Sequence, residues 1–593
     1  MSRIRNAFFL LLLIGGHVCT LTLATAEITP RLAARLTREK VAHRIPLLIT
    51  LKHRYDMESI LRDDADLSRA DVIRLLMRNA YLSQAALHRA IGTEAARQGQ
   101  TLWITNQFAM ELPAWRVAAL TQVDGVETVD LDAAIHLAEP VAAPPPVQPE
   151  WNLDLVAAKE LWELGYRGEG VVVAVMDSGA DVLHPDLAGN WRGGSNSWFD
   201  PNGEHGSPHD NDGHGTQVLG LIVGGDSSGT AVGVAPAAQW IAVKIFNDQG
   251  QASLSNIHRG FQWLLDPDGD LATDDAPDIV NNSWSLLGSL DECVNEFALD
   301  IRVLRLFGIH VVFSAGNSGP AASTSVSPAN DARSFSVGSV AASRIVTLTS
   351  SRGPSACDGS IFPLITAPGA GVRTSDLTFG GVSTHPYVTV SGTSFAAPHA
   401  AGVIALLRSA FPGAGLDSME EGILAGALDL GEAGPDNAYG HGLLDALTAF
   451  YRLQQQDPMS QTDADGDGFP AQADDPDLRD CDDQDPAIFP GAAEIKHDGI
   501  DQDCNGFDLT IDILTALYDP VRDILRVEAT SARGSSAGLF LISQSLGQQR
   551  VKPLRMKYYL GKWTAIVRQI GGDPGSVIVL GREGLESAAT TVR

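Results

Sequence analysis

The chain has few cysteines, few aromatic residues and fewer basic than acidic residues. Each shortage limits the kinds of protein that the chain can be. Only 5 cysteines occur among 593 residues, which excludes a scaffold held together mainly by disulfides. Aromatic residues make up 6%, yet hydrophobic residues reach 44%, enough for cores in several domains. There are 42 Lys and Arg against 72 Asp and Glu, a net charge of −30. This acidic balance argues against a nucleic acid or an anionic membrane as partner.

Long apolar runs are also scarce, and the clearest one lies at the start of the chain. Arg3 and Arg5 precede an apolar stretch over 7–14, and Ala24-Thr25-Ala26 supplies small residues at a cleavage position. This order predicts a secretory signal peptide over 1–26. A retained anchor is the alternative, but the run is short for a bilayer span. We therefore expect a mature protein without a membrane span, located outside the cell or in the periplasm, with attachment to the cell surface left open.

The cysteines fit an oxidising compartment. Cys19 falls in the predicted leader, which leaves Cys293 and Cys357 in the middle of the chain and Cys481 and Cys504 in its later part. An even number, two in each region, predicts one disulfide in each region. Four free buried thiols are the alternative.

Proline-rich and polar stretches divide the chain into regions. The first region after the leader carries strand and helix patterns in the order βαββαβ, which is typical of a small open-faced sandwich. A run of prolines follows it and predicts a stiff, extended linker. The predicted regions are this small α+β domain at 27–140, the Pro-rich linker at 141–150, an α/β domain at 151–453, a linker at 454–462, an acidic segment at 463–508 and a small β domain at 509–593.

In the largest region, β-branched runs alternate with stretches that have helical spacing of apolar residues. Runs such as 171–176 have the composition of buried parallel strands. Strands that alternate with helices predict a parallel sheet with helices on both faces. The predicted strands include 171–176, 240–245 and 309–313, and the predicted helices include 254–264, 297–307 and 396–411.

Three polar residues of this region stand at the ends of predicted elements. Asp177 directly follows a strand, His214 lies between two glycines ahead of an apolar helix, and Ser394 lies in a tight turn before another helix. Each alone has an ordinary explanation as a cap, a loop residue or an N-cap. Together, in the order Asp, His, Ser, they favour a carboxylate, a base and a nucleophile that meet at one edge of the sheet.

The residues around these three positions resemble the subtilisin-like serine proteases of the peptidase S8 family, over about 151–453. The resemblance implies that Ser394 is the nucleophile, His214 the general base and Asp177 the group that orients His214. It also implies that the Asn317 amide and the Ser394 backbone N–H form the oxyanion hole. The similar stretches are 177–179, 214–216, 233–236, 311–319 and 392–399, while 281–284 and 350–354 look most like the bacillopeptidase F branch.

The same resemblance predicts a serine endopeptidase made as a preproenzyme, with protein or peptide substrates. It implies that 27–140 is a propeptide that assists folding and acts as an intramolecular inhibitor, with maturation within 137–150; an unrelated domain is the alternative. Ser283, Trp284 and Ser285 take the place of the strand beside the primary pocket. Many relatives have Gly where this chain has Ser285, so the depth of the pocket stays open.

The acidic segment has carboxylates at alternate positions of glycine-containing loops, a pattern that suits a hard cation such as calcium. It resembles calcium-binding repeats of bacterial surface proteins. With little apolar content, it would depend on metal and a Cys481–Cys504 bridge. A solvated acidic linker is the alternative, and a catalytically silent calcium-binding surface or adhesion protein is the competing function. The candidate ligands are Asp463, Asp465, Asp467, Asp482, Asp483, Asp485, Asp501, Asp503 and Asn505.

Overall fold

The described part of the chain forms two compact units, residues 1–452 and 453–593. Within it, we find no helix that is long and apolar enough to cross a membrane. The predicted domain boundaries at 140 and 150 stay predictions, because both sides belong to the first unit. The computed structural model describes residues 26–54, 67–137, 150–286, 288–456, 481–482, 485, 487–488, 511–531, 539–543, 554–568, 576–580 and 587–591.

A seven-stranded parallel sheet forms the centre of the first unit, in the order β14-β13-β12-β11-β7-β9-β8. Every pairing in it is parallel, so its carboxyl ends share one edge. The predicted α/β fold is confirmed. The strands are β7 (Val172–Asp177), β8 (Trp198–Phe199), β9 (Gln239–Lys244), β11 (Ile279–Asn282), β12 (His310–Ser314), β13 (Phe335–Val340) and β14 (Ile365–Pro368).

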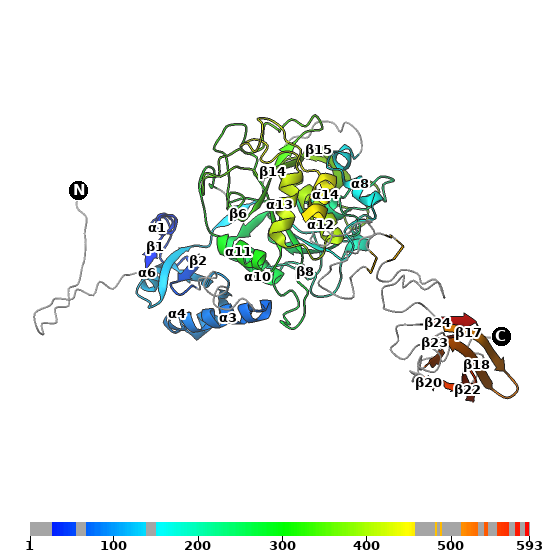
Figure 1. Ribbon diagram of the computed structural model, residues 1–593. Helices are drawn as coiled ribbons and strands as arrows, with labels where there is room; N and C mark the ends of the chain where they lie inside the picture. The colour runs from blue at the N-terminus through cyan, green and yellow to red at the C-terminus, as the bar shows by residue number, and fades with distance from the viewer. Residues whose placement is uncertain are drawn as a thin grey trace, which may run out of the picture. The chain divides into compact units, whose positions relative to one another are not determined.

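Helices cover both faces of this sheet (Figure 1). Alternate residues of the strands, such as Ala174 and Met176, join one apolar core with α10 and α11, because successive side chains of a strand point to opposite faces. The other face packs on α9 and α12, and α12 is buried from Ala397 to Leu407. The helices are α7 (Trp151–Leu155), α8 (Ala158–Glu163), α9 (His214–Val223), α10 (Leu254–Leu264), α11 (Ala298–Leu306), α12 (Ala397–Ala410), α13 (Leu416–Gly426) and α14 (Ala446–Gln456), with short 3-10 turns η1 (Ala188–Asn190) and η2 (Thr393–Phe395).

The N-terminal domain has its own five-stranded sheet, in the order β1-β5-β2-β4-β3. One face of this sheet encloses a separate apolar core with α1, α4 and α6. The alternation of strands and helices predicted for this region is present. Its elements are β1 (Glu27–Ile28), α1 (Pro30–Leu36), β2 (Arg44–Leu51), α3 (Arg69–Ser83), α4 (Ala85–Ile91), α5 (Thr93–Gln98), β3 (Gln100–Leu102), β4 (Gln107–Pro113), α6 (Ala114–Leu120) and β5 (Val126–Leu131).

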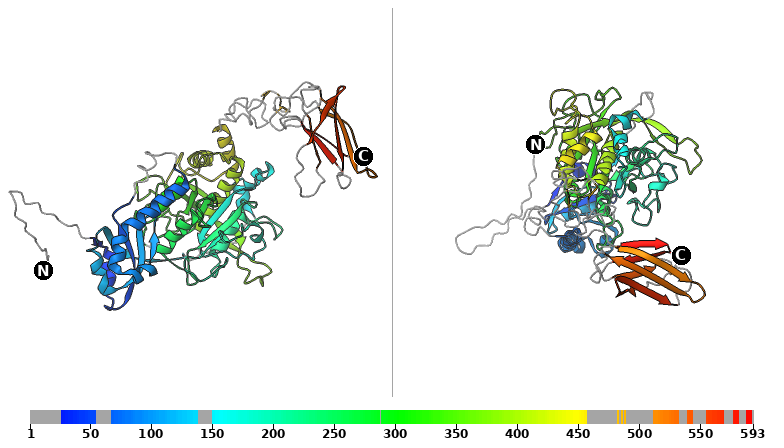
Figure 2. Two further views of the ribbon diagram at one scale, coloured as in Figure 1. Left: turned by 90° about the horizontal axis from the view of Figure 1, so that it is seen from below. Right: turned by 45° about the vertical axis from the view of Figure 1, so that its right-hand side comes forward.

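The N-terminal domain lies against α10 and α11 of the large domain (Figure 1), and the left view of Figure 2 shows its blue elements beside the green part of the large domain. Leu48, Trp103 and Ile104 belong to the same apolar core as these two helices. At the end of the domain, β6 (Ala134–His136) pairs antiparallel with β10 (Gln251–Ser253) of the large domain. The contact therefore combines an apolar face with a two-stranded antiparallel sheet that contains one strand from each domain.

Three of the described cysteines are disulfide-bonded. Cys293 and Cys357 are bonded to each other, which joins the segment before α11 to the loop between β13 and β14 and confirms a disulfide in this region. Cys481 is disulfide-bonded as well, and its predicted partner Cys504 lies outside the described residues.

The second unit contains two four-stranded antiparallel sheets, β17-β18-β22-β21 and β20-β19-β23-β24. Apolar residues from both sheets, among them Val527, Trp563 and Val579, share one core. The small β domain expected here is present. Its strands are β17 (Ile511–Asp519), β18 (Ile524–Ser531), β19 (Phe540–Ser543), β20 (Leu554–Arg555), β21 (Lys557–Tyr559), β22 (Lys562–Arg568), β23 (Ser576–Leu580) and β24 (Ser587–Thr591).

Candidate active site

The fold places the four predicted catalytic residues at the ends of neighbouring elements. Asp177 is the last residue of β7 and His214 the first residue of α9. Asn317 follows β12, and Ser394 lies in η2, between β16 (Tyr387–Ser391) and α12. Since the strands are parallel, the carboxyl ends of β7 and β12 open onto the same edge of the sheet.

Asp177 and His214 form a buried pair. His214 Nδ1 lies 2.7 Å from Asp177 Oδ1, which also accepts the Ser178 N–H at 2.7 Å. Burial opposes protonation of His214, but the Asp177 charge and hydrogen bond, together with the charges of Asp212 and Asp210, outweigh burial and raise the pKa of His214. The carboxylate thus fixes the ring tautomer and stabilises the imidazolium.

The Ser394 turn lies against the His214 ring. The Phe395 ring centroid is 5.4 Å from that of His214. Ser394 is only 6% exposed, and its hydroxyl donates to the Ser283 carbonyl at 3.4 Å. The Ser283 hydroxyl in turn donates to the Ser394 carbonyl at 2.8 Å. The hydrogen bond from the Ser394 hydroxyl to the Ser283 carbonyl is long and therefore weak, so it constrains the direction of that hydroxyl only slightly.

Asn317 is oriented by the residue before the serine. Its Oδ1 accepts the Thr393 N–H at 2.9 Å and the Thr393 hydroxyl at 3.0 Å, so its NH₂ group points away from Thr393. Gly392 has φ of 141°, a value that favours glycine, and a Cβ there would lie 3.4 Å from Asn317 Nδ2. The Gly-Thr-Ser sequence therefore sets both the turn and the direction of a free amide donor.

Asp210 organises the loop before His214, and the sequence patterns did not single it out. Its carboxylate accepts the Ser178 hydroxyl at 2.9 Å, the Gly213 N–H at 2.9 Å, and the Thr216 N–H and hydroxyl at 2.9 and 2.7 Å. It thereby ties β7 to the start of α9. The Asn-Asp-Gly context of a tight loop is the only sequence signal that points to it.

A buried histidine supports the Ser394 turn from behind. His399 Nδ1 donates to the Phe395 carbonyl at 2.8 Å, and Asn152 Nδ2 donates to His399 Nε2 at 2.9 Å. Burial lowers the pKa of His399 to about 4, although the bond to Phe395 acts in the opposite direction. The ring is therefore neutral, and it joins α7 to the first turn of α12. No sequence pattern pointed to a role for this pair.

The segment predicted to lie beside the primary pocket is buried to a large degree. The Trp284 side chain packs in the core against Phe297 and Phe313, at centroid distances of 5.7 and 5.4 Å. Ser283 contacts Ser394 as described above, and Ser285 is half-buried. Any contact of Trp284 with a substrate would therefore come from its backbone.

Of the predicted metal ligands, Asp482 and Asp485 belong to the described residues. The Asp485 N–H donates to the Asp482 carbonyl at 2.9 Å, and Asp485 Oδ1 accepts the Ala487 N–H at 3.2 Å, as in a tight acidic turn. The other predicted ligands, Asp463, Asp465, Asp467, Asp483, Asp501, Asp503 and Asn505, lie outside the described residues.

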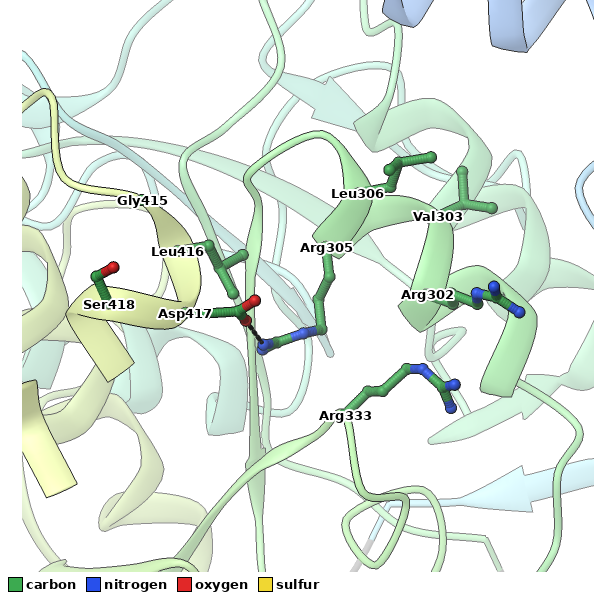
Figure 3. Close-up of a pocket in the computed structure, with 9 residues that line it drawn as sticks. All are labelled: Arg302, Val303, Arg305, Leu306, Arg333, Gly415, Leu416, Asp417 and Ser418. Carbon is green, nitrogen blue, oxygen red and sulfur yellow. Dashed lines mark hydrogen bonds and ion pairs between the residues drawn. The ribbon is translucent and has the colours of Figure 1, made fainter. Parts of the chain in front are cut away.

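A pocket lined by arginines lies between α11 and the start of α13 (Figure 3). It has a volume of about 570 Å³. Within it, Arg305 pairs with Asp417 at 2.9 Å, and Arg305 also pairs with Glu420 at 2.7 Å. None of the predicted catalytic side chains lines it, so this pocket is separate from the candidate active site.

Comparison with known proteins agrees with the geometry. A model of the subtilase family, peptidase S8, matches residues 168–442, which include all four predicted catalytic positions. A second model, Cu-binding MopE, which describes a metal-binding motif, matches residues 480–508.

Individual proteins match the same part of the chain. Bacillopeptidase F of Bacillus subtilis (strain 168) is 36% identical over 323 residues, 51% of this chain but only 22% of that protein. The major intracellular serine protease of the same organism is 31% identical over 264 residues, 44% of this chain and 74% of the relative. Subtilisin BL of Lederbergia lenta is 33% identical over 305 residues, 50% of this chain and 97% of the relative.

Proposed function

Because this chain belongs to the subtilase family, and is thus a serine-type endopeptidase, we propose that Asp177, His214 and Ser394 are its catalytic triad. The observation that carries this proposal is the buried 2.7 Å contact between His214 Nδ1 and Asp177 Oδ1, next to the turn that contains Ser394. It leaves Nε2 as the ring atom for proton transfer.

The proposed reaction begins when His214 Nε2 removes the Ser394 hydroxyl proton and Oγ attacks the peptide carbonyl carbon. The oxyanion that forms accepts hydrogen bonds from the Asn317 NH₂ group and the Ser394 N–H. His214 then gives its proton to the leaving amine, and the C–N bond breaks to leave an acyl-enzyme. A water molecule, deprotonated by His214, hydrolyses the ester and restores Ser394. Asp177 stays ionised and stabilises the imidazolium.

We further propose that the enzyme is a secreted preproenzyme in which the N-terminal domain is the inhibitor. Two observations support this role: the domain shares an apolar core with α10 and α11, and β6 pairs antiparallel with β10 of the large domain. A peptide substrate would likewise bind in an extended conformation, by pairing with a strand of the large domain. In the full chain, processing within 137–150 should precede activity, and Ser394→Ala protein should keep its N-terminal domain when it is produced alone.

The metal-binding segment at 480–508 is proposed to hold calcium. Its donors are chiefly carboxylates and amides, with His497 the single imidazole and Cys481 in a disulfide. Hard oxygen donors fit calcium better than copper, which favours nitrogen and sulfur. The ion would supply structural stabilisation. A chelator should lower the melting temperature and protease resistance of the second unit, and no change would count against calcium.

Active-site labelling tests the main proposal. A fluorophosphonate probe should label the processed protein, and Ser394→Ala should abolish the label. Ser343→Ala is a matched control, since Ser343 is exposed on a surface turn. Correctly processed protein that is not labelled would instead favour the silent calcium-binding surface protein.

A further inference from the structure

Two histidines and an aspartate meet on the loops beside the candidate active site, and the proposed triad does not use them. His205 Nε2 lies 3.0 Å from Asp248 Oδ2 and 3.1 Å from Oδ1. The His205 and His209 rings are stacked, with centroids 3.9 Å apart. One potential ligand atom from each of the three side chains lies within 4.8 Å of the others.

The backbone at His205 is held in place by its neighbours. The His205 N–H donates to Asp200 Oδ2 at 2.8 Å, and its carbonyl accepts the Trp198 Nε1–H at 3.0 Å. Downstream of His209, Asp210 anchors the loop through the bonds described above. The loop can therefore present both imidazoles without first folding around an ion.

Asp248 lies on the turn between β9 and β10, and hydrogen bonds to its backbone hold it in place. Its N–H donates to Glu204 Oε2 at 2.9 Å, and its carbonyl accepts Asn211 Nδ2 at 3.2 Å. Both partners come from the loop that carries the histidines, so the two loops are already connected. Glu204, Asp200 and Asp210 also make the surroundings acidic, while Lys244 Nζ faces the carboxylate at 3.2 Å from Asp248 Oδ1.

We propose that His205, His209 and Asp248 bind a divalent transition-metal ion of the zinc class, with water as a further ligand. Two imidazoles and a carboxylate are a common donor set for zinc, whereas calcium prefers oxygen alone. Donor atoms that lie about 2.0–2.2 Å from a tetrahedral zinc are about 3.3–3.5 Å from one another. His205 Nε2 and Asp248 Oδ2, 3.0 Å apart, are already that close, so the adjustment falls mainly on His209, which lies within 4.8 Å of both. The exposed His209 side chain has the freedom to make that movement.

An ion at this position would join the loop that leads to His214 to the turn that leads to β10. It would share Asp248 with Lys244, whose ammonium also donates to the Ser178 carbonyl at 2.8 Å. Ser178 directly follows Asp177, so Asp248 and Lys244 would connect the ion to the candidate active site. This inference does not depend on the proposed protease mechanism, because binding needs only these three side chains.

Calorimetric titration with zinc tests the site. The full chain with Ser394→Ala prevents self-cleavage, and excess calcium occupies sites in the acidic segment. We expect one class of zinc sites that His205→Ala, His209→Ala or Asp248→Asn each weakens by at least about tenfold. His385→Ala, which removes another exposed histidine of the same unit, should leave zinc affinity unchanged.

Thermal unfolding gives a second readout. Zinc should raise the melting temperature of the parent but not that of His209→Ala, whose exposed side chain can be removed without disturbing the core. Cobalt in place of zinc should give a d–d absorption spectrum that the same variant loses. Equal zinc affinity in the parent and in the His205→Ala/His209→Ala double variant would overturn the proposal and assign the ion to other groups, such as the acidic segment.

Discussion

Two buried histidine–aspartate pairs in the first unit have nearly the same geometry at Nδ1 and differ at the other ring nitrogen. His214 Nδ1 lies 2.7 Å from Asp177, and His258 Nδ1 lies 2.9 Å from Asp300. His258 Nε2 also faces Glu296, at 3.3 Å. No group within the described residues makes a hydrogen bond to His214 Nε2, so that atom can still accept a proton.

In the second pair, the additional carboxylate of Glu296 keeps His258 positively charged. Burial opposes the charge of His258, but Asp300 and Glu296 outweigh it and raise the pKa of His258 to about 10. At neutral pH this ring carries two protons and cannot act as a base. Glu296 also accepts Gln107 Nε2 at 3.2 Å, so the second pair links α10, α11 and the N-terminal domain. A histidine–aspartate pair therefore supports catalysis only where its outer nitrogen stays open.

The largest expected effect comes from His214→Ala. Without the base, Ser394 stays protonated, and kcat should fall by about a millionfold, the size found in subtilisin when this member of the triad is removed. Steady-state assays on variant protein that the parent enzyme has processed in trans measure the loss, and urea unfolding should show a folded protein. If the folded variant keeps substantial activity, His214 is not the base and the comparison between the two pairs is wrong.

The equivalent change in the other pair, His258→Ala, should act on stability instead. It leaves Asp300 buried without its partner, and breaking such a pair costs about 3–5 kcal/mol of unfolding free energy. Urea unfolding of Ser394→Ala protein with and without the substitution measures the cost. Processed enzyme should keep its kcat, and a double variant that also carries Asp300→Leu should recover part of the stability. A fall in kcat without loss of stability would contradict the assignment.

Periodic sequence patterns were sufficient for the large elements. The β-branched run at 171–176 became β7, and the apolar spacing at 254–264 became α10 with the same bounds. Such signals are local, because a helix or strand that is buried on one or two faces has apolar residues at a regular spacing along the sequence. The order of strands and the pairing of β6 with β10 depend on contacts between distant segments, and no spacing along the chain encodes them.

The candidate site was predictable only where its residues stand at element ends. Asp177, His214 and Ser394 follow strands or precede helices, so the pattern exposes them. Trp284 shows the limit of such reasoning. It was predicted to lie beside the primary pocket, but its side chain packs into the core. His205 and Asp248 are 43 positions apart and carry no motif, so only the folded chain brings them together.

His399 is a third buried histidine, and it extends the comparison of His214 with His258 because it has no carboxylate partner among the described residues and stays neutral. Its pKa of about 4 lies below the ordinary value of 6.5, so the unfolded chain binds a proton between these values and the folded one does not. The stability that His399 contributes is present above pH 6.5 and is lost as pH falls toward 4. From about pH 7.5 to pH 5 this amounts to ~2 kcal/mol. Urea unfolding at both pH values should show that His399→Gln has a smaller pH dependence than the parent; equal dependence would contradict a neutral ring.

The smallest expected effect is a change in the pH dependence of kcat/KM when a charge near the His214–Asp177 pair is removed. Asp212 accepts the His214 N–H at 3.2 Å, and its charge helps to raise the pKa of His214. Asp212→Asn removes that charge, so the imidazolium becomes less stable and the pKa of His214 falls. Because the neutral ring is the active form, the acid limb of kcat/KM should move to lower pH. Asp226→Asn, which changes an exposed carboxylate beyond the far end of α9, should leave the limb in place, and a shift to higher pH in Asp212→Asn would show that this charge does not act on His214.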